Sequence, residues 1–320
     1  MKERIKFAII KSFKFLLFII IFFVTTNNFF VGILLFLVAN IKLIRRSIFG
    51  RLPYKVSKKA SRGPFSYNYT SHLKLDLYYP TEGDAPFPVV VFAHGGGWIT
   101  GFKRQPNNVS WYRFLNSQGF AVASLEYRKA FYAKIDNIIS DYSQAVKFIQ
   151  ENAFKLKVNP EKIVLMGLSA GGHLALYYTA RNSFLKNLSS SIKAVVAFYA
   201  PCDLTDLLSE EVTSFFARFA LVTTMKTLPV RNSINCIHYS PITWVSDSMP
   251  PVFLAHGLKD TVVPPKSSIK MYKKLRSFKV KAVLKIHPKG DHGFEFVLKD
   301  GFTYKILDDL VSFLKCVVEK

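Results

Sequence analysis

Short apolar runs that alternate with helical patterns constrain the fold of this chain more than any other feature of its 320 residues. Residues 88–93 form one such run, Pro-Val-Val-Val-Phe-Ala, which is typical of a strand buried on both faces. Apolar residues between the runs recur at helical spacing, as they do over residues 135–149. Strands that alternate with helices predict a mainly parallel sheet with helices on both faces. The apolar runs cover residues 88–93, 120–125, 163–166, 194–199, 252–255 and 280–286.

Two segments depart from this alternation. Leucines at every second position of residues 73–77 precede Pro80, which predicts a half-buried edge strand. Residues 204–245 contain no buried-strand pattern but are rich in Phe, Leu and Val. We expect them to form an insertion or lid that contributes to the wall of a substrate pocket.

Ser169 lies at a predicted turn from strand to helix. It is the central residue of Gly-Leu-Ser-Ala-Gly, residues 167–171, which follows the apolar run 163–166 and precedes a helical pattern. A serine at such a turn takes a strained backbone conformation that needs small neighbours and exposes its hydroxyl above the sheet edge. We therefore interpret Ser169 as a candidate nucleophile, and the alternative is an ordinary serine in a glycine-rich turn.

Three consecutive glycines follow the strand predicted at residues 88–93. They belong to His-Gly-Gly-Gly-Trp, residues 94–98, and let backbone N–H groups converge on one point, as stabilisation of an oxyanion requires. A phosphate-binding loop has Lys and then Ser or Thr behind its glycines, whereas Trp98 and Ile99 follow here. We expect His94 to shape this loop through hydrogen bonds.

A serine hydroxyl becomes a nucleophile only when a base takes its proton and an acid orients that base. Both partners are expected in loops after later strands, in the order serine, acid, histidine. Asp260 follows the apolar run 252–255, and His292 follows the run 280–286. They are the candidate acid and base.

Other acids and histidines compete for these roles. Asp203, after the fourth apolar run, is the alternative acid. Asp291 is the sequence neighbour of His292, and neighbours seldom direct their side chains at one another. His287 directly precedes a proline and His256 precedes a glycine turn, so we expect both histidines to stabilise loops.

Six motifs resemble those of a known group of enzymes. From about residue 70 to residue 318 the sequence resembles the α/β-hydrolase fold. Within that fold it is similar to the hormone-sensitive-lipase-like esterases and their relatives, which include prenylcysteine methylesterases and arylformamidases. Many of these esterases have Asp before the nucleophile, where this chain has Leu168, and an uncharged segment replaces their usual N-terminal cap. Both departures concern the substrate and not the reaction. The matching segments are 94–98 (His-Gly-Gly-Gly-Trp), 126–128 (Glu-Tyr-Arg), 167–173 (Gly-Leu-Ser-Ala-Gly-Gly-His), 240–241 (Ser-Pro), 256–260 (His-Gly-Leu-Lys-Asp) and 291–294 (Asp-His-Gly-Phe).

The resemblance implies a serine carboxylic ester hydrolase, of carboxylesterase or lipase type, that acts through an acyl-enzyme without a metal or an organic cofactor. In that mechanism Ser169 attacks the ester, His292 transfers the proton and Asp260 orients the imidazole. Amide hydrolysis, as in an arylformamidase or a peptidase, is the alternative activity, and a non-catalytic relative that acts as a binding protein is a third interpretation. The implied oxyanion hole consists of the backbone N–H groups of Gly96, Gly97 and Ala170, next to the loop-shaping residues His94, Gly95 and Trp98.

Composition narrows the class of protein further. Half of the residues are apolar and a fifth are charged, which excludes a disordered chain. The three cysteines, Cys202, Cys236 and Cys316, are too scattered to predict a disulfide framework or a structural zinc site.

Positive charge is concentrated at the N-terminus. Residues 1–62 contain 13 Lys and Arg against one acid, Glu3, and so account for +12 of the formal net charge of +23. They flank residues 16–41, which have no charged side chain over 26 positions, more than the roughly 20 that span a bilayer. This clustering favours anionic lipid headgroups over nucleic acid as the partner.

We therefore predict three parts. Residues 1–41 form a basic N-terminus and a transmembrane anchor, residues 42–65 a basic linker, and residues 66–320 the α/β-hydrolase domain. The heavier basic side follows the uncharged run, which predicts a cytoplasmic hydrolase domain that acts on small-molecule or lipid-like esters. The alternatives are a hairpin with both ends in the cytoplasm and a cleaved signal peptide, which would make the protein secreted or lumenal.

Overall fold

The structure, a computed structural model, describes residues 48–212, 214–227 and 234–319. The predicted transmembrane anchor, residues 16–41, lies outside the described residues. Among the residues that are described, no helix is both long enough and apolar enough to cross a membrane. The chain divides into two compact units, Met1–Gly50 and Arg51–Lys320, and the second unit contains all the elements described below.

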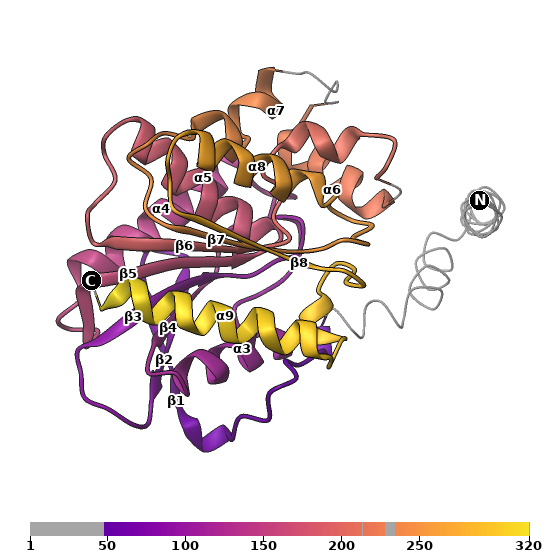
Figure 1. The fold of residues 1–320 in the computed structure, drawn as a ribbon. Helices are drawn as coiled ribbons and strands as arrows, with labels where there is room; N and C mark the ends of the chain where they lie inside the picture. The colour runs from indigo at the N-terminus through magenta and orange to yellow at the C-terminus, as the bar shows by residue number, and fades with distance from the viewer. Residues whose placement is uncertain (1–47, 213, 228–233, 320) are drawn as a thin grey trace, which may run out of the picture. The chain divides into compact units, whose positions relative to one another are not determined.

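Eight strands form one sheet in the second unit (Figure 1). Their order is β1-β2-β4-β3-β5-β6-β7-β8, in which β3 to β8 run parallel and β1 and β2 are antiparallel to their neighbours. The prediction of a mainly parallel sheet is confirmed, because each apolar run of the sequence overlaps one of the strands β3 to β8. The strands are β1 (Ser61–Asn68), β2 (Lys74–Pro80), β3 (Phe87–Ala93), β4 (Ala121–Leu125), β5 (Val158–Leu168), β6 (Ile192–Phe198), β7 (Val252–Gly257) and β8 (Ala282–His287).

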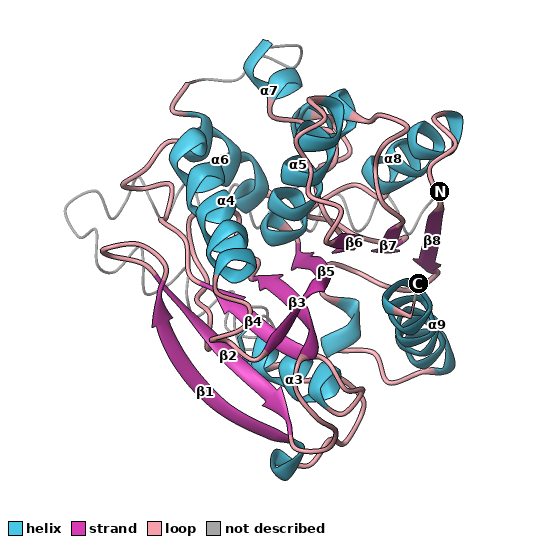
Figure 2. Ribbon diagram, turned by 90° about the vertical axis from the view of Figure 1, so that its left-hand side faces the viewer, coloured by secondary structure: helices cyan, strands magenta, loops and turns pink. Residues whose placement is uncertain are grey.

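Helices cover both faces of the sheet (Figure 2). Along β3, Val89, Val91 and Ala93 belong to a core cluster that includes residues of α4, α5 and α8. Val90 and Phe92 belong to a second cluster, with residues of α3 and α9, because successive side chains of a strand point to opposite faces. The helices are α3 (Pro106–Asn116), α4 (Ile135–Glu151), α5 (Ala170–Phe184), α6 (Phe215–Met225), α7 (Ile234–His238), α8 (Lys266–Ser277) and α9 (Gly301–Val318), with short 3-10 helices η1 (Lys58–Ala60), η2 (Leu204–Leu208), η3 (Pro241–Trp244) and η4 (Phe294–Phe296).

The sheet edge differs from the sequence prediction. β2 contains two of the three alternating leucines of residues 73–77, but it lies between β1 and β4, so the predicted edge strand is wrong. β1 is the edge strand, and because most of its side chains are exposed the sequence shows no apolar alternation that would predict it.

Asp76 of β2 is buried and forms ion pairs with Lys103 at 2.8 Å and Arg104 at 2.5 Å. These two cations accommodate a charged side chain inside the sheet.

The predicted linker, residues 42–65, also differs from the structure. β1 begins within it, so the domain boundary predicted after residue 65 falls inside a strand. Further upstream, Leu52 is buried, and the ring of Tyr54 lies 5.1 Å from those of both Phe114 in α3 and Tyr304 in α9. The second half of the predicted linker therefore belongs to the folded unit, because its aromatic side chain packs on helices that lie far away in the sequence.

Candidate active site

Ser169 is the single residue between the end of β5 and the start of α5. Its φ of 51° lies in the left-handed region, which a non-glycine residue keeps only where its surroundings hold it there. A Cβ atom on Gly171 would lie 2.1 Å from the carbonyl O of Ala93. A Cβ atom on Gly167 would lie 2.1 Å from the backbone C of Gly171. The glycines around the serine are therefore required by the close approach of three backbone segments.

His292 connects Ser169 to a buried acid. Its Nε2 lies 3.0 Å from Ser169 Oγ, and its Nδ1 lies 2.8 Å from Asp260 Oδ2. His292 is in the loop after β8 and Asp260 in the loop after β7, so parallel strands bring both residues to the edge at which β5 ends. The structure thus brings together the three residues that the sequence singled out as nucleophile, base and acid.

The protonation states of this pair follow from its surroundings. Asp260 Oδ1 accepts the backbone N–H groups of Val262 at 2.8 Å and Val263 at 2.9 Å, and His256 Nε2 lies 3.2 Å from Oδ2. Burial by itself raises the pKa of Asp260, but His292 and the hydrogen bonds from both histidines hold it well below its ordinary value. Burial lowers the pKa of His292, but the charge and hydrogen bond of Asp260, together with the nearby carboxyl groups of Asp291 and Glu295, outweigh burial and raise it. Asp260 is therefore ionised and favours the imidazolium form of His292.

The competing acid and histidine have other partners. Asp203 accepts the backbone N–H at the start of η2 and forms an ion pair with Lys270 at 3.1 Å. His287 Nε2 lies 2.9 Å from Asp300 Oδ1. Asp203 thus stabilises the start of η2 and contacts α8, and His287 connects the end of β8 to the start of α9. Within the ranges that the structure describes, no group of three or more His, Cys, Asp or Glu side chains could hold a metal ion.

The glycine loop after β3 faces Ser169. Gly97 and Trp98 line a pocket together with Ser169 and Ala170. Ala170 is the first residue of α5, where a backbone N–H has no acceptor within its own helix. Gly96, with φ of 116°, closes the loop because its carbonyl O accepts two backbone N–H groups from the residues that follow. Gly97 and Ala170 therefore lie beside Ser169 at the pocket, and Gly96 shapes the turn between them and the strand.

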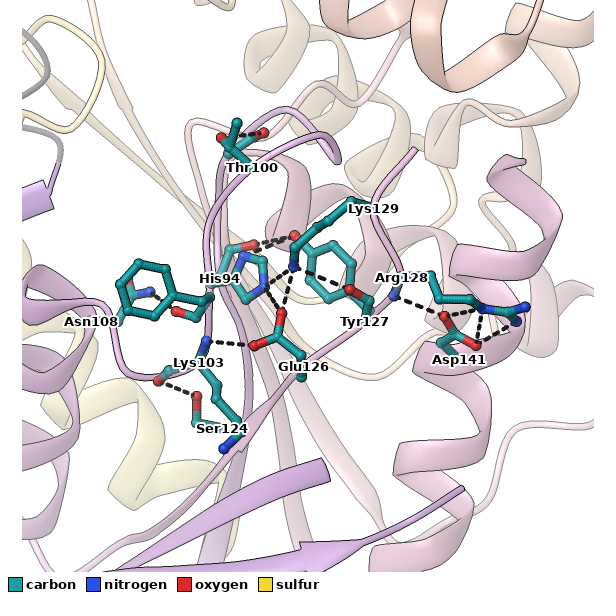
Figure 3. A network of polar contacts seen from close by, with 12 residues as sticks. His94, Thr100, Lys103, Asn108, Ser124, Glu126, Tyr127, Arg128, Lys129 and Asp141 are labelled. Carbon is teal, nitrogen blue, oxygen red and sulfur yellow. Dashed lines mark hydrogen bonds and ion pairs between the residues drawn. The ribbon is translucent and has the colours of Figure 1, made fainter. Parts of the chain in front are cut away.

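A buried polar network of His94, Tyr127, Lys129 and Glu126 supports the glycine loop (Figure 3). His94 Nδ1 lies 2.7 Å from the carbonyl O of Gly95, and the hydroxyl of Tyr127 donates to the carbonyl O of His94 at 2.7 Å. Lys129 Nζ lies 3.0 Å from His94 Nε2 and 2.5 Å from Glu126 Oε1. His94 thus has the contacts that a loop-shaping residue needs, and Lys129 and Glu126 are partners to which the sequence analysis assigned no role.

The charges of this network fit a neutral His94. Burial lowers the pKa of His94, and an ammonium donor at Nε2 leaves the proton of the neutral ring on Nδ1, which donates to the Gly95 carbonyl. Burial raises the pKa of Glu126, but the ammonium group of Lys129, 2.5 Å from its Oε1, opposes burial and keeps that pKa below its ordinary value. One signal for this network was available in the sequence. Glu126 directly follows β4, the parallel neighbour of β3, so its side chain had to lie beside the glycine loop.

The pocket beside Ser169 is mainly apolar, and the predicted insertion forms part of it. The described residues of 204–245 fold as η2, α6, α7 and η3 between β6 and β7. The lining residues from this segment are Leu207, Phe216, Ala217 and Ala220, and the others are Gly97, Trp98, Ser169, Ala170, Pro201, Val262 and Val263.

Comparison with known families shows the group to which this chain belongs. The family model described as BD-FAE matches residues 75–275, which is more than half of the chain. The chain belongs to the BD-FAE family. The BD-FAE match includes the glycine loop, Ser169 and Asp260, and it ends before His292.

Curated relatives of this BD-FAE protein include methylesterases and esterases. It is 28% identical over 253 residues to the probable isoprenylcysteine alpha-carbonyl methylesterase ICME of Oryza sativa subsp. japonica, an alignment that covers 75% of this chain and 60% of that protein. It is also 28% identical over 220 residues to Esterase LipC of Mycobacterium tuberculosis, covering 66% and 54% of the two chains. The resemblance found in the sequence is confirmed. The chain spans about 60% of the length of the first of these relatives.

Solved structures show the same fold. A truncated carbohydrate esterase from gut microbiota superposes with a TM-score of 0.72 at 22% identity, covering 85% of this chain and all of that one. The bifunctional GH43-CE protein of Bacteroides eggerthii gives a TM-score of 0.69 at 26% identity, covering 83% of this chain and 36% of that one. The BD-FAE protein therefore has the α/β-hydrolase fold.

Proposed function

We propose that this BD-FAE protein is a serine carboxylic ester hydrolase. The observation that carries the proposal is the chain of contacts from Ser169 Oγ to His292 at 3.0 Å and from His292 to Asp260 at 2.8 Å, beside an apolar pocket. The names of its curated relatives, which are methylesterases and esterases, support the same reaction.

The geometry supports a two-step acyl transfer. Ser169 Oγ bonds to the ester carbonyl carbon while its proton passes to His292 Nε2, which lies 3.0 Å away. The imidazolium then protonates the leaving alkoxide, and an acyl-serine remains. A water molecule then bonds to the acyl carbon while one of its protons passes to Nε2. The bond between the acyl carbon and Ser169 Oγ breaks, the imidazolium returns the proton to Oγ, and the acid product leaves. Asp260 stays ionised throughout and keeps the remaining ring proton on Nδ1.

The tetrahedral intermediate needs donors on the other side of the carbonyl group. The backbone N–H groups of Gly97 and Ala170 serve as these donors in the proposed mechanism, with Gly96 beside them. Each preorganised donor of this kind contributes about 3 kcal/mol to stabilisation of the transition state. The loop can supply them because His94 and its polar network fix its backbone before the substrate arrives.

Exposed aromatic side chains near the pocket support an apolar ester as substrate. Phe216 of α6 lines the pocket and is 41% exposed. On the same helix, Phe215 and Phe219 are exposed, and their rings lie 5.9 Å apart. Phe131 and Tyr132 extend this aromatic surface, with Tyr132 92% exposed and Phe131 6.3 Å from Phe219. Such a surface favours substrates with a lipid-like part that extends beyond the pocket.

We further propose that residues 16–41 anchor the protein in a membrane, with the hydrolase domain in the cytoplasm. The uncharged run of 26 residues and the basic residues on both sides of it support this placement. An anchored hydrolase meets substrates that partition into the bilayer, which agrees with an apolar ester.

A hydrolysis panel tests the proposed reaction. The protein is assayed with p-nitrophenyl esters of short to long acyl chains, with a prenylcysteine methyl ester and with an aryl formamide. We expect hydrolysis of the esters, and covalent labelling of Ser169 by an alkyl phosphonate that mass spectrometry locates. Hydrolysis of the formamide alone would assign amide chemistry to the same residues. No turnover of any substrate, together with no phosphonate adduct, would reject a catalytic role.

A further inference from the structure

A second buried carboxyl group lies behind His292. Glu295, in η4, is completely buried, and its Oε1 accepts a hydrogen bond from the hydroxyl of Tyr199 at 2.6 Å. Its other oxygen, Oε2, has no hydrogen-bond partner among the described residues. Buried carboxyl groups are costly unless they are paired. The mechanism above does not use Glu295, so its place beside the site needs an explanation.

Tyr199 connects this carboxyl group to the candidate base. It directly follows β6 with φ of 39°, and its backbone N–H donates to the carbonyl O of Ala255 at 2.7 Å. The centroid of its ring lies 4.5 Å from that of His292, with the two planes inclined by 57°. His292 thus has Ser169 at Nε2, Asp260 at Nδ1 and the tilted ring of Tyr199 beside it. The hydroxyl bond to Glu295 keeps that ring in position.

The charge of Glu295 also acts on His292. The titratable groups that face the carboxyl are Tyr199 from the end of β6 and His292 from the loop after β8. Asp260 after β7 acts on both of them, and Asp291 acts on His292. From α3, Trp111 contributes a neutral indole. Burial raises the pKa of Glu295 to about 7, although the hydrogen bond from Tyr199 opposes that rise. Glu295 therefore carries its negative charge above about neutral pH.

We propose, on the basis of the proposed ester hydrolysis, that Glu295 is a positioning residue for His292. Through Tyr199 it fixes the plane of the imidazole between Ser169 and Asp260. Its negative charge also stabilises the imidazolium that forms when Nε2 takes the serine proton, in a site where little water screens the interaction. The aromatic face of Tyr199 favours the same cation.

Two variants and one matched control test this role. Glu295→Gln removes the charge and keeps an acceptor for Tyr199, whereas Tyr199→Phe keeps the ring and removes the bond to Glu295. Asp309→Asn removes an equal charge from α9, where the carboxylate contacts Lys285 and Lys305. The readouts are the pKa of His292, from an NMR titration of its ring in the free protein, and the pH profiles of kcat and kcat/KM.

We expect Glu295→Gln to lower the pKa of His292 by at most about one unit, because the variant removes a negative charge that favours the imidazolium. The acid limb of the kcat/KM profile moves to lower pH with it, and kcat falls about tenfold at an unchanged KM because the imidazolium is less well stabilised when Nε2 takes the serine proton. Tyr199→Phe shifts both quantities in the same direction, and the double variant adds little to either single variant. Asp309→Asn leaves the pKa of His292 and the pH profile unchanged.

An unchanged pKa of His292 in folded Glu295→Gln would overturn the inference. If Glu295→Gln does not fold, an unchanged pKa of His292 in folded Tyr199→Phe would overturn the inference instead. A wild-type protein that hydrolyses no ester would reject the proposed function, and the NMR titration would still show whether Glu295 and His292 are coupled.

Discussion

At the scale of single residues, the strained conformation of Ser169 is the feature on which the proposed chemistry depends. A left-handed φ in a serine costs free energy, and it is kept here because Gly171 admits the backbone of Ala93 and Gly167 admits that of Gly171. That arrangement aims the hydroxyl at His292 before a substrate binds. Substitutions at this position therefore separate chemistry from folding.

We expect Ser169→Ala and His292→Ala each to lower kcat by about 10⁴-fold or more, because nucleophile and base act as one unit. Ser169→Ala removes a single oxygen atom, so its thermal unfolding temperature should stay within a few degrees of wild type, as circular dichroism will show. His292→Ala removes a partner of buried Asp260 and should unfold at a lower temperature. Near-normal turnover by folded Ser169→Ala would contradict the mechanism.

The two candidate acids form a matched pair. Asp260→Asn replaces an acceptor of the His292 Nδ1 proton with an amide, which permits the wrong tautomer, and we expect kcat to fall by about 10³- to 10⁴-fold. Asp203→Asn removes a partner of Lys270 and should change kcat less than about threefold, as expected for a partly exposed ion pair. Steady-state kinetics of both variants decide the question, and the reverse outcome would assign the acid to the loop after β6.

At the scale of elements, the start of α5 and the glycine loop depend on close backbone packing. Gly171→Ala places a methyl group where the Ala93 carbonyl O lies, and we expect a loss of about 3 kcal/mol or failure to fold. Gly301→Ala at the start of α9 is the matched control, because its Cβ meets no atom within 4 Å. Gly301→Ala should raise the free energy of unfolding by no more than about 1 kcal/mol. Urea unfolding measures the free energy of unfolding of both variants. Equal changes would show that the close approach of the Ala93 carbonyl is not the reason for glycine at position 171.

The network behind the glycine loop predicts a pH dependence of stability. The pKa of Glu126 is lowered from 4.5 to about 2 in the folded state, so its stabilisation is present above pH 4.5 and is lost as the pH falls towards 2. Glu126→Gln leaves Lys129 without its carboxylate and should cost about 2 kcal/mol at neutral pH. The variant should also lose less stability than wild type between those two pH values. Identical acid unfolding curves would show that Glu126 is not ionised in this network.

At the scale of the whole molecule, the proposed anchor and the folded unit can be tested separately. We expect the full chain to pellet with membranes and to resist washing with high salt and alkali, because hydrophobic burial exceeds the roughly 1 kcal/mol that each basic residue gains at an anionic surface. Release by salt alone would indicate a peripheral protein held by its basic residues, and N-terminal sequencing that finds a start beyond residue 40 would indicate a removed targeting segment.

The point at which the chain is shortened matters for that experiment. A protein that begins at Arg51 keeps buried Leu52 and the Tyr54 ring on α3 and α9, and should be active and free of membranes. A protein that begins at Gly63 loses these contacts and the start of β1, and should be less stable by about 3 kcal/mol. Melting temperatures of the two shortened proteins provide the measurement, and equal values would place residues 51–62 outside the folding unit.

The sequence by itself determined the parallel sheet, because apolar runs are a local signal of strands buried on both faces. It also singled out Ser169, Asp260 and His292, because each follows a predicted strand and parallel strands end at one edge. Their meeting in the structure agrees with that prediction.

The tertiary structure alone decided what surrounds these residues. β1 gave no periodic signal because the edge strand exposes most of its side chains, and β2 became internal only through pairing with it. The contact between Tyr199 and Glu295 joins positions 96 residues apart, and Lys129 reaches His94 across 35 residues. Spacing along a chain cannot predict such contacts, because the direction of a buried side chain is set by the packing of several elements at once.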